Sequence, residues 1–328
     1  MTDVGEHRFL DALCRRLRGR RRGDGPTILV EPGDDCAVLA ASPHPQAMTT
    51  DTLVEGVHFR PAWLSARELG RRATTVNLSD LAAMAATPTA VLMSVTVPPS
   101  TPVATLDDIL DGCADACEEA GAALVGGNLA RGNPLSLTLT AIGDVRGPRL
   151  ERAGARAGDL LVVTGTLGDA AAAVAAWLAG DEPTAALRLR WVAPTARVAA
   201  ARTLAAAGAS AAIDLSDGLR ADLGHLCRAS GVGAIVERAR LPRSADVAVL
   251  DDAGSDFALS GGEDYELLLA CPPELEPRLP ALSHACGIAL TVVGRCTEAA
   301  DLLLQQADGR LGPLGAIGYD HFSGSRTA

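Results

Sequence analysis

Segments patterned as strands alternate with segments patterned as helices along the whole chain, in two successive sets. The first set runs to about residue 143, and the second opens at residues 160–164 after a Gly147-Pro148 turn. Alternation of this kind is typical of α/β and α+β layers. At 328 residues the chain is also long enough for two cores. We therefore predict two domains, at residues 1–148 and 149–328, with the boundary between residues 145 and 155.

The apolar periodicity predicts where the individual elements lie. Helices are expected at residues 7–18, 66–85, 105–120, 168–179, 184–207 and 217–230. Strands are expected at residues 27–30, 36–40, 46–50, 89–97, 122–126, 135–143, 160–164, 233–237, 265–270 and 289–294.

The sequence contains no lysine, so all 29 of its Lys and Arg positions are arginine. A P-loop needs a lysine at the β and γ phosphates, and the protein-kinase fold needs a strand lysine paired with a helix glutamate. Schiff-base and pyridoxal chemistry need a lysine amine as well. If this protein handles ATP, it must neutralise phosphate charge with arginines, helix N-termini and metal ions.

The net charge of −11 disfavours a nucleic-acid partner, because a phosphate backbone is bound by a basic surface. Arginines cluster only once, within residues 15–22. This cluster is either a solvated helix end followed by a loop, or a mobile arm that attracts a phosphorylated ligand. The sequence leaves both interpretations open.

No segment has the pattern of a membrane span or an export signal. The longest apolar run, at residues 170–179, is half the length that a membrane span needs, and we interpret it as a buried helix. Asp3 and Glu6 stand where a signal peptide would be basic. None of the eight cysteines forms a Cys-x-x-Cys pair, and Cys113 and Cys117 are interpreted as small core residues. We expect a cytoplasmic protein with no membrane partner and no zinc site.

Four short acidic motifs stand beside small or hydroxyl residues at turns of the chain. They are Gly33-Asp34-Asp35, Thr49-Thr50-Asp51-Thr52 at the end of a predicted strand, Asn77-Leu78-Ser79-Asp80, and Ile213-Asp214-Leu215-Ser216-Asp217-Gly218. Asn77 and Asp80 are one helical turn apart and share a face. Each motif taken singly is typical of a cap or a turn. Together they favour a site for Mg²⁺, which takes one or two carboxylates plus phosphate oxygens and water.

A fifth motif, at residues 259–266, contains paired glycines followed by Glu263 and Asp264 ahead of a predicted strand. Paired glycines let a backbone approach a ligand closely, and they equally permit a tight turn. A binding loop and a simple turn both remain open at this point.

In this order the motifs resemble the thiamine-monophosphate kinase family. The resemblance rests on residues 33–37, 50–59, 76–84, 212–219 and 259–267 and on Gly318-Tyr319-Asp320-His321-Phe322. It therefore covers nearly the whole chain. The Gly-Asp-Asp element is shared with the wider superfamily that includes aminoimidazole ribonucleotide synthetase. Residues 50–59 and 318–322 are similar to the thiamine enzymes specifically.

The resemblance implies an α/β (α+β) fold of the aminoimidazole ribonucleotide synthetase type. A ferredoxin-like N-terminal domain would bind ATP and Mg²⁺ and form a homodimer, and a larger α/β domain would follow. The implied activity is ATP-dependent phosphorylation of thiamine monophosphate to thiamine diphosphate, the last step of thiamine diphosphate biosynthesis, with several Mg²⁺ ions.

The family's functional residues carry over onto matching positions of this chain. The implied metal ligands are Asp35, Thr49, Thr50, Asp51, Asp80, Asn128, Asp214 and Asp217. The implied ATP contacts are Gly127, Asn128, Arg152 and Ser216, and the implied thiamine monophosphate contacts are His58, Glu263 and Tyr319. The implied catalytic residues are Asp51, Asp214 and Arg152.

These residue types fit a reaction between two anions, the γ-phosphate of ATP and a phosphate acceptor. The acceptor oxygen is largely deprotonated near neutral pH, because the second phosphate pKa is about 6. No strong general base is needed. The obstacle is repulsion, which metal ions held by carboxylates would relieve while they align the oxygens in line. A guanidinium such as that of Arg152 would clamp the transferring phosphate.

One residue departs from the family pattern. Where the family has Gly-Gly-Asp, this chain has Gly126-Gly127-Asn128. Asparagine offers a carbonyl oxygen but no charge, so we expect one Mg²⁺ to bind more weakly, beside Asp51. Two alternatives stay open: another ATP-dependent synthetase of the same superfamily, and a non-catalytic paralogue that binds the phosphorylated vitamin.

Overall fold

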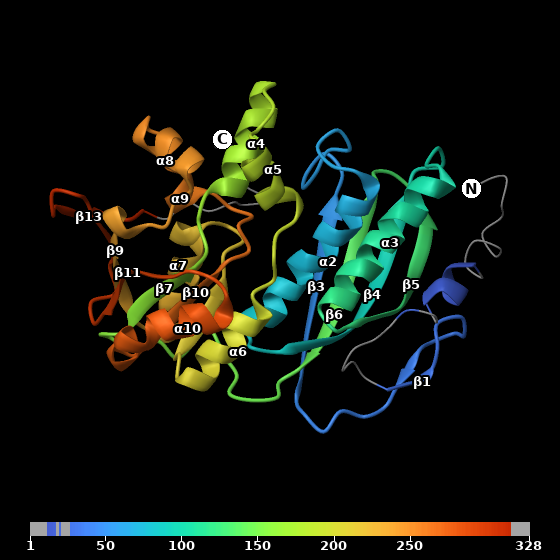
Figure 1. The fold of residues 1–328 in the computed structure, drawn as a ribbon, viewed down its shortest axis with the longest axis horizontal. Helices are drawn as coiled ribbons and strands as arrows, with labels where there is room; N and C mark the ends of the chain where they lie inside the picture. The colour runs from blue at the N-terminus through green and yellow to red at the C-terminus, as the bar shows by residue number, and fades with distance from the viewer. Residues whose placement is uncertain (1–11, 18–19, 21–26, 316–328) are drawn as a thin grey trace. The chain divides into compact units, whose positions relative to one another are not determined.

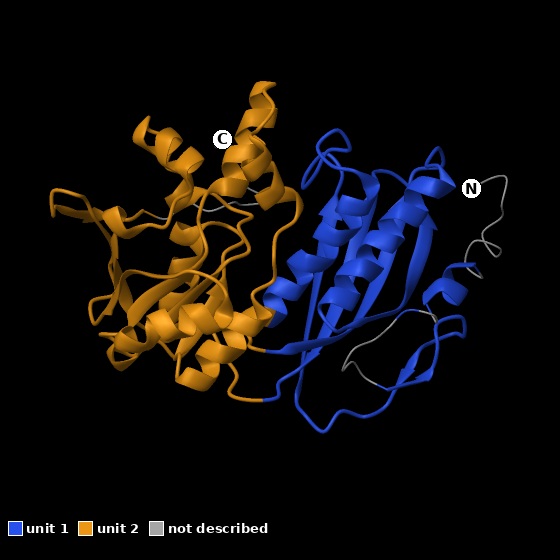
Figure 2. Cartoon of the chain, in the orientation of Figure 1, with its two compact units in different colours: residues 1–81, 86–146 blue, residues 82–85, 147–328 orange. Residues whose placement is uncertain are grey.

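The computed structural model describes residues 12–17, 20 and 27–315 of the chain. The chain divides into two compact units, coloured separately in Figure 2. Unit 1 comprises Met1–Leu81 and Ala86–Arg146, and unit 2 comprises Ala82–Ala85 and Gly147–Ala328. Each unit contains one of the two larger sheets.

Unit 1 is built on a four-stranded sheet whose strands lie in the order β3-β6-β4-β5. These strands are β3 (Gln46–Val54), β6 (Ser136–Asp144), β4 (Thr87–Val97) and β5 (Ala123–Arg131). Helices α2 (Ala66–Ala83) and α3 (Val103–Glu119) cover one face of the sheet, as Figure 1 shows. Buried and half-exposed residues alternate along β6, as expected for a sheet with one covered face. Strands β3 and β5 are the two edges.

A short antiparallel pair, β1 (Ile28–Val30) and β2 (Val38–Leu39), adds a second layer to unit 1. Ile28 and Leu39 pack against a small buried cluster. The cluster consists of Ala90, Ala123 and Val125. The pair therefore covers part of the sheet face that the helices leave open.

Two glycines set the distance between α2 and α3. A Cβ atom at Gly70 would lie 1.9 Å from the Ile109 carbonyl oxygen, and one at Gly112 would lie 2.0 Å from the Arg67 carbonyl oxygen. Neither distance leaves room for a carbon atom, so the helices can lie this close only because both positions lack a side chain.

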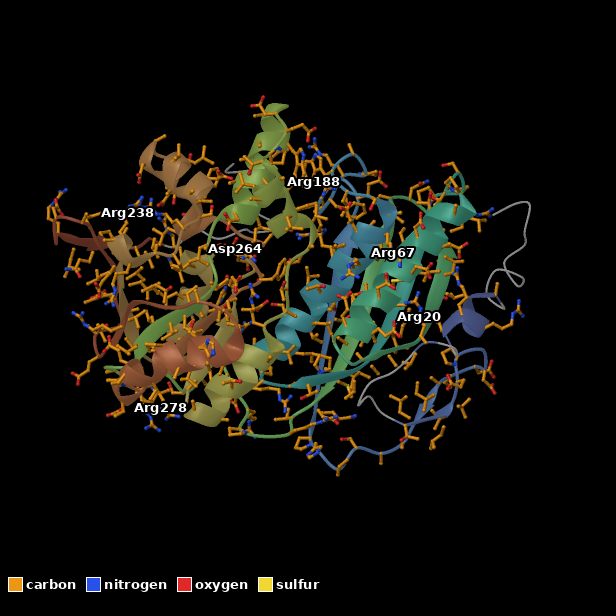
Figure 3. All side chains as sticks on the ribbon, in the orientation of Figure 1. Arg20, Arg67, Arg188, Arg238, Asp264 and Arg278 are labelled. Carbon is orange, nitrogen blue, oxygen red and sulfur yellow. The ribbon has the colours of Figure 1, made fainter. Side chains whose placement is uncertain are left out.

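The predicted arginine cluster pairs with α3 where the structure describes it. Arg20, labelled in Figure 3, lies 3.1 Å from Asp111 and 2.8 Å from Asp115. Arg16 lies 2.6 Å from Asp107. These two arginines bind carboxylates of the protein itself, which neither interpretation of the cluster anticipated. Positions 18, 21 and 22 lie outside the described residues.

Unit 2 is built on a seven-stranded mixed sheet in the order β13-β12-β9-β11-β7-β10-β8. Its strands are β7 (Leu160–Thr164), β8 (Ala211–Asp214), β9 (Gly233–Glu237), β10 (Leu267–Cys271), β11 (Leu290–Thr297), β12 (Leu302–Gln305) and β13 (Leu311–Pro313). Its helices are α4 (Asp169–Ala179), α5 (Ala185–Val192), α6 (Val198–Ala207), α7 (Leu219–Ser230), α8 (Ala245–Asp252), α9 (Phe257–Ser260) and α10 (Leu279–Cys286). Every residue of β8 and β10 is buried.

The predicted mixed α and β fold class is confirmed. The apolar run at residues 170–179 forms most of helix α4, as predicted, but the helix is only partly buried: Ala170, Ala172, Ala173 and Trp177 are buried, whereas Leu178 is 44% exposed. None of the helices in the described residues combines the length and the apolar character that crossing a membrane requires.

Three local predictions are wrong. The single helix expected at residues 184–207 is two helices, α5 and α6, because Pro194 between them cannot continue a helix. Thr49–Thr52 does not end a strand but lies inside β3, which continues to Val54. Likewise Gly126–Asn128 lies inside β5, which runs five residues beyond its predicted end. Strand β8, helices α8 to α10 and strands β12 and β13 were not predicted, since short buried or mixed segments carry little periodicity.

We predict that Gly112→Ala destabilises the α2–α3 pair. Alanine raises intrinsic helix stability by about 1 kcal/mol. The new methyl group, however, must displace the Arg67 carbonyl, and over-packing costs about 1–3 kcal/mol or more. We expect a net loss of about 1–2 kcal/mol in the free energy of unfolding, measured by urea denaturation followed by circular dichroism.

Gly224→Ala is the matched control, because a Cβ atom there meets only Leu302 Cδ1 at an ordinary 3.6 Å. This change within α7 should stabilise the protein by up to about 1 kcal/mol. A Gly112→Ala variant as stable as the control would mean that α2 and α3 have room to spare.

Candidate active site

The second and third acidic motifs meet in unit 1. Thr49 Oγ1 donates a hydrogen bond to Asp80 Oδ2 at 2.5 Å, and the Asp51 amide donates to Asn77 Oδ1 at 3.0 Å. Thr49 and Asp51 are two residues apart on β3 and therefore point to the same side, toward one face of α2. We refer to Thr49, Asp51, Asn77 and Asp80 as the β3–α2 cluster.

The β3–α2 cluster concentrates negative charge. Partial burial, together with the charge of Asp80, raises the pKa of Asp51 to about 6, even though part of the residue is open to solvent. Among the described residues no arginine or histidine lies within ion-pair distance of Asp51 or Asp80. A cation delivered with a ligand would therefore stabilise both carboxylates.

Two predicted ligands make hydrogen bonds outside this cluster. Thr50 points to the other side of β3, where its hydroxyl donates to the Leu139 carbonyl at 2.9 Å. Asp35 lies on the exposed loop after β1, where its amide donates to the side chain of Asp34 at 2.8 Å.

Asn128 lies at the opposite edge and on the opposite face from Asp51. The register pairs Thr52 with Thr138, Thr138 with Ser94, and Ser94 with Asn128, so these side chains form one row across the face away from the helices. Asp51 precedes Thr52 and points the other way. Three strand spacings put β5 about 14 Å from β3. The expectation that Asn128 and Asp51 of one chain share a Mg²⁺ is therefore wrong.

Gly127 and His58 both have a structural role. A Cβ atom at Gly127 would lie 1.8 Å from the Met93 carbonyl oxygen, so the pairing of β5 with β4 requires glycine there. The Val54 amide donates to His58 Nδ1 at 3.0 Å, which assigns the proton of a neutral ring to Nε2. His58 Nδ1 therefore closes the turn after β3.

The fourth and fifth motifs meet in unit 2 because β8 and β10 are antiparallel neighbours, with Asp214 opposite Leu267. The loop that follows β8 (residues 214–218, the Asp214 loop) and the loop that precedes β10 (residues 261–266, the Glu263 loop) consequently lie at one end of the sheet. The Glu263 amide donates to the Ser216 carbonyl at 2.8 Å. A Cβ atom at Gly262 would lie 2.6 Å from that same oxygen, so glycine permits this close approach of two loops.

The Glu263 loop is strained and firmly held. Glu263 and Tyr265 have φ angles of 69° and 51°, in the left-handed region that disfavours side chains at a cost of about 1–3 kcal/mol each. Asp264 between them, labelled in Figure 3, is buried and accepts a hydrogen bond from the Gly168 amide at 2.8 Å. Burial raises the pKa of Asp264 to about 8. Strain maintained in this way is characteristic of functional sites.

Sequence reasoning missed a further carboxylate, Asp222, beneath the Asp214 loop. Asp222 is buried in the first turn of α7 and accepts a hydrogen bond from the Asp217 amide at 3.0 Å. Burial, followed by the charges of Asp217 and Asp214, raises the pKa of Asp222 to about 8. The sequence did carry a signal for Asp222, because it is an acidic residue four positions after Gly218, at the start of a predicted helix and close to the fourth acidic motif.

The donors in both places are oxygen atoms of the kind that Mg²⁺ takes. Within the described residues no three His, Cys, Asp or Glu side chains are gathered so closely that they would hold a metal ion by themselves. Mg²⁺ typically binds one or two carboxylates and completes its octahedron with phosphate oxygens and water. The raised pKa values of Asp51 and Asp222 mark carboxylates that lack sufficient positive charge. The residues therefore fit Mg²⁺ that arrives with phosphate.

The backbone of Arg152 lies beside β8, where the Ala212 amide donates to the carbonyl of the neighbouring Glu151 at 3.0 Å. The Arg152 carbonyl accepts a hydrogen bond from Ser230 Oγ at 2.8 Å, at the end of helix α7 that is away from Asp217. The role of Arg152 as a phosphate clamp stays a prediction. Tyr319 lies outside the described residues.

Comparison with known proteins defines the class first. Residues 33–145 match the N-terminal domain, and residues 156–305 the C-terminal domain, of the AIR synthase related proteins. The predicted fold type is thereby confirmed.

More specific relatives define the family. Thiamine-monophosphate kinase of Escherichia coli (strain K12) is 39% identical over 322 residues, which cover 95% of this chain and 98% of that protein. The crystal structure of thiamine-monophosphate kinase from Stenotrophomonas maltophilia K279a superposes with a TM-score of 0.81 at 37% identity, covering 94% of this chain and 98% of that one. The structure of AaThiL complexed with AMPPCP and TMP gives a TM-score of 0.74 at 29% identity, covering 98% of both chains. The chain belongs to the thiamine-monophosphate kinase family.

We predict that Asp222→Asn stabilises the metal-free protein in a pH-dependent way. The pKa of aspartate is about 3.9 when unfolded, and that of Asp222 is raised to about 8 in the fold. Between these values the folded state holds a proton that the unfolded state has lost, so wild-type stability falls as pH rises. The Asp222→Asn variant has no carboxyl group at this position, so its stability does not fall with pH for this reason. Its advantage in urea denaturation should therefore grow from pH 4 to pH 8, to about 2 kcal/mol or more, and then level off.

Asp181→Asn removes an exposed carboxylate of unit 2 and is the control, with no such pH trend expected. An advantage of Asp222→Asn that is the same at every pH would contradict the account of a carboxyl group that is protonated in the fold.

Proposed function

We propose that the protein transfers the γ-phosphate of ATP directly to thiamine monophosphate, giving thiamine diphosphate and ADP. The observation that carries this proposal is the meeting of the Asp214 loop with the strained Glu263 loop in a chain of this family. The complex of AaThiL with AMPPCP, an ATP analogue, and TMP supports both substrates. We also propose that this transfer is the last step of thiamine diphosphate biosynthesis and takes place in the cytoplasm.

In this proposal Asp51 and Asp80 would hold Mg²⁺ in unit 1, and Asp214 and Asp217 would hold Mg²⁺ in unit 2. Bound Mg²⁺ would supply positive charge that offsets the repulsion between the two phosphate groups during in-line transfer. The protein contributes the carboxylates, held in place by Asn77 and by the Asp222 side chain, which fix the backbone amides of Asp51 and Asp217. No side chain need act as a base, because the acceptor phosphate is already ionised near neutral pH.

Glu263 and His58 are proposed to recognise the acceptor. Thiamine carries a permanently cationic thiazolium ring, which suits the carboxylate of Glu263. The Nε2 donor of His58 suits an anionic phosphate oxygen. Ser216, whose carbonyl holds the Glu263 amide, is proposed to place the nucleotide beside the acceptor.

A homodimer formed through the open face of the unit 1 sheet is part of the proposal. Met48 and Leu92 on this face are 66% and 40% exposed, and apolar side chains so placed favour a protein partner. Asn128 lies on the same face, so it is proposed to act toward a ligand at the partner subunit. Because Asn128 lies outside the β3–α2 cluster of its own chain, the asparagine removes none of the carboxylates in that cluster. This favours an active enzyme over the non-catalytic paralogue.

We predict that purified protein forms thiamine diphosphate from ATP and thiamine monophosphate only when Mg²⁺ is present. Asp51→Asn should lower turnover by about 100-fold or more and raise the Mg²⁺ concentration for half-maximal rate, because a ligand charge is lost. Chromatographic assay of thiamine diphosphate measures both effects. Asp108→Asn, at an exposed carboxylate on α3, is the matched control and should behave as wild type.

Each alternative gives its own result in the same assay. ATP consumption that needs a different acceptor would identify another synthetase of the superfamily. Tight binding of thiamine monophosphate without any turnover would identify a binding protein and overturn the kinase assignment.

A further inference from the structure

Helix α5 holds the Glu263 loop at two points. Trp191 Nε1 donates a hydrogen bond to Glu263 Oε2 at 2.7 Å, and the preceding residue, Arg190, donates to Glu266 Oε1 at 2.7 Å. Glu263 and Glu266 stand on either side of the strained Tyr265. Two consecutive residues of one helix therefore fix the carboxylates at both ends of the strained segment.

Glu266 is the immobile end of this arrangement. It is fully buried, and both of its oxygens accept hydrogen bonds. Arg197 donates from Nε to Oε2 at 2.7 Å and from Nη2 to Oε1 at 2.5 Å, and Thr164 Oγ1 donates to Oε2 at 2.6 Å. A two-point arginine–carboxylate pair fixes direction as well as distance. Glu266 thus ties the end of the loop to α5, to α6 and to strand β7.

Trp191 is equally fixed, and it bonds to a side chain that solvent can reach. Its ring is fully buried and packs edge-on against Trp177 with 5.1 Å between ring centroids, so the indole N–H has one direction. Glu263, by contrast, is only half-buried. The core therefore dictates where one carboxylate oxygen of a surface-accessible glutamate lies.

We propose that Trp191 is a positioning residue for the acceptor, which holds the Glu263 carboxylate in the orientation that receives the cationic part of thiamine monophosphate. The inference rests on the proposed function and extends it to a residue that does not touch the reacting phosphates. A carboxylate that is already oriented loses less freedom when a cation binds, so the acceptor binds more tightly. Trp191 acts through Glu263 and affects affinity for the acceptor, not the transfer itself.

The test is Trp191→Phe, which keeps an apolar ring in the core but removes the N–H donor. KM for thiamine monophosphate should rise about tenfold, the effect of one lost hydrogen bond to a charged group. KM for ATP and kcat should change by less than about twofold, since Asp51 and the Asp214 loop are untouched. Leu189→Ala, which changes an exposed residue of the same helix, is the control and should leave KM for thiamine monophosphate unchanged.

A double-mutant cycle with Glu263→Gln separates positioning from packing. In that background the charge that recognises the cation is gone, so Trp191→Phe should raise KM by less than about twofold. Glu263→Asp provides a second route that leaves the core intact. It keeps the charge but withdraws it from Trp191, and it should also raise KM for thiamine monophosphate.

Three results would overturn the inference: an unchanged KM for thiamine monophosphate in Trp191→Phe, an equal rise in KM for ATP, or full additivity in the cycle. If Trp191→Phe does not fold, a wild-type KM in Glu263→Asp overturns it instead. Failure of the proposed function is recognised separately, by a wild-type protein that makes no thiamine diphosphate. Calorimetric titration with thiamine monophosphate then decides the role of Trp191, since the loss of affinity is expected without turnover.

Discussion

Burial of carboxylates that repel one another is the constraint on which the candidate sites of both units depend. Burial, together with the charge of Asp80, raises the pKa of Asp51 to about 6, and burial, together with the charges of Asp217 and Asp214, raises that of Asp222 to about 8. A chain without lysine can relieve such repulsion with arginine, with protons or with bound cations. At Asp222, whose pKa of about 8 lies above neutral pH, the metal-free protein uses a proton. A nucleotide that arrives with Mg²⁺ would replace that proton.

The two sheets hold these charges by different means. In unit 1, the edge strand β3 and the helix α2 carry the carboxylates, and the close backbone contact of α2 with α3 at Gly70 and Gly112 holds α2 in place. In unit 2, the antiparallel pairing of β8 with β10 brings together two loops that are far apart in the sequence. The buried pair of Glu266 with Arg197 then fixes the end of the second loop. Breaking such a pair leaves an uncompensated buried charge, which makes the loop hard to displace.

Residue periodicity accounts for what the sequence could predict. The mixed fold class followed from alternating patterns, and the spacing of Asn77 and Asp80 correctly placed both on one helix face. The position of Asn128 could not be predicted, because strand order depends on pairing between distant segments. The contact of Trp191 with Glu263 could not be predicted either, since a helical pattern does not reveal which side chain reaches a distant loop. The break at Pro194, in contrast, carried a local signal that the predicted long helix ignored.

The most direct test of this account is a calorimetric titration of metal-free protein with Mg²⁺ at pH 7, with a non-hydrolysable ATP analogue present. Running it in two buffers of different ionisation enthalpy measures the protons released on binding. The account predicts binding with net proton release, because Asp222, with its pKa raised to about 8, must give up its proton as cations bind nearby. Equal heats in the two buffers, or no binding at all, would contradict the claim that bound cations replace the proton of Asp222.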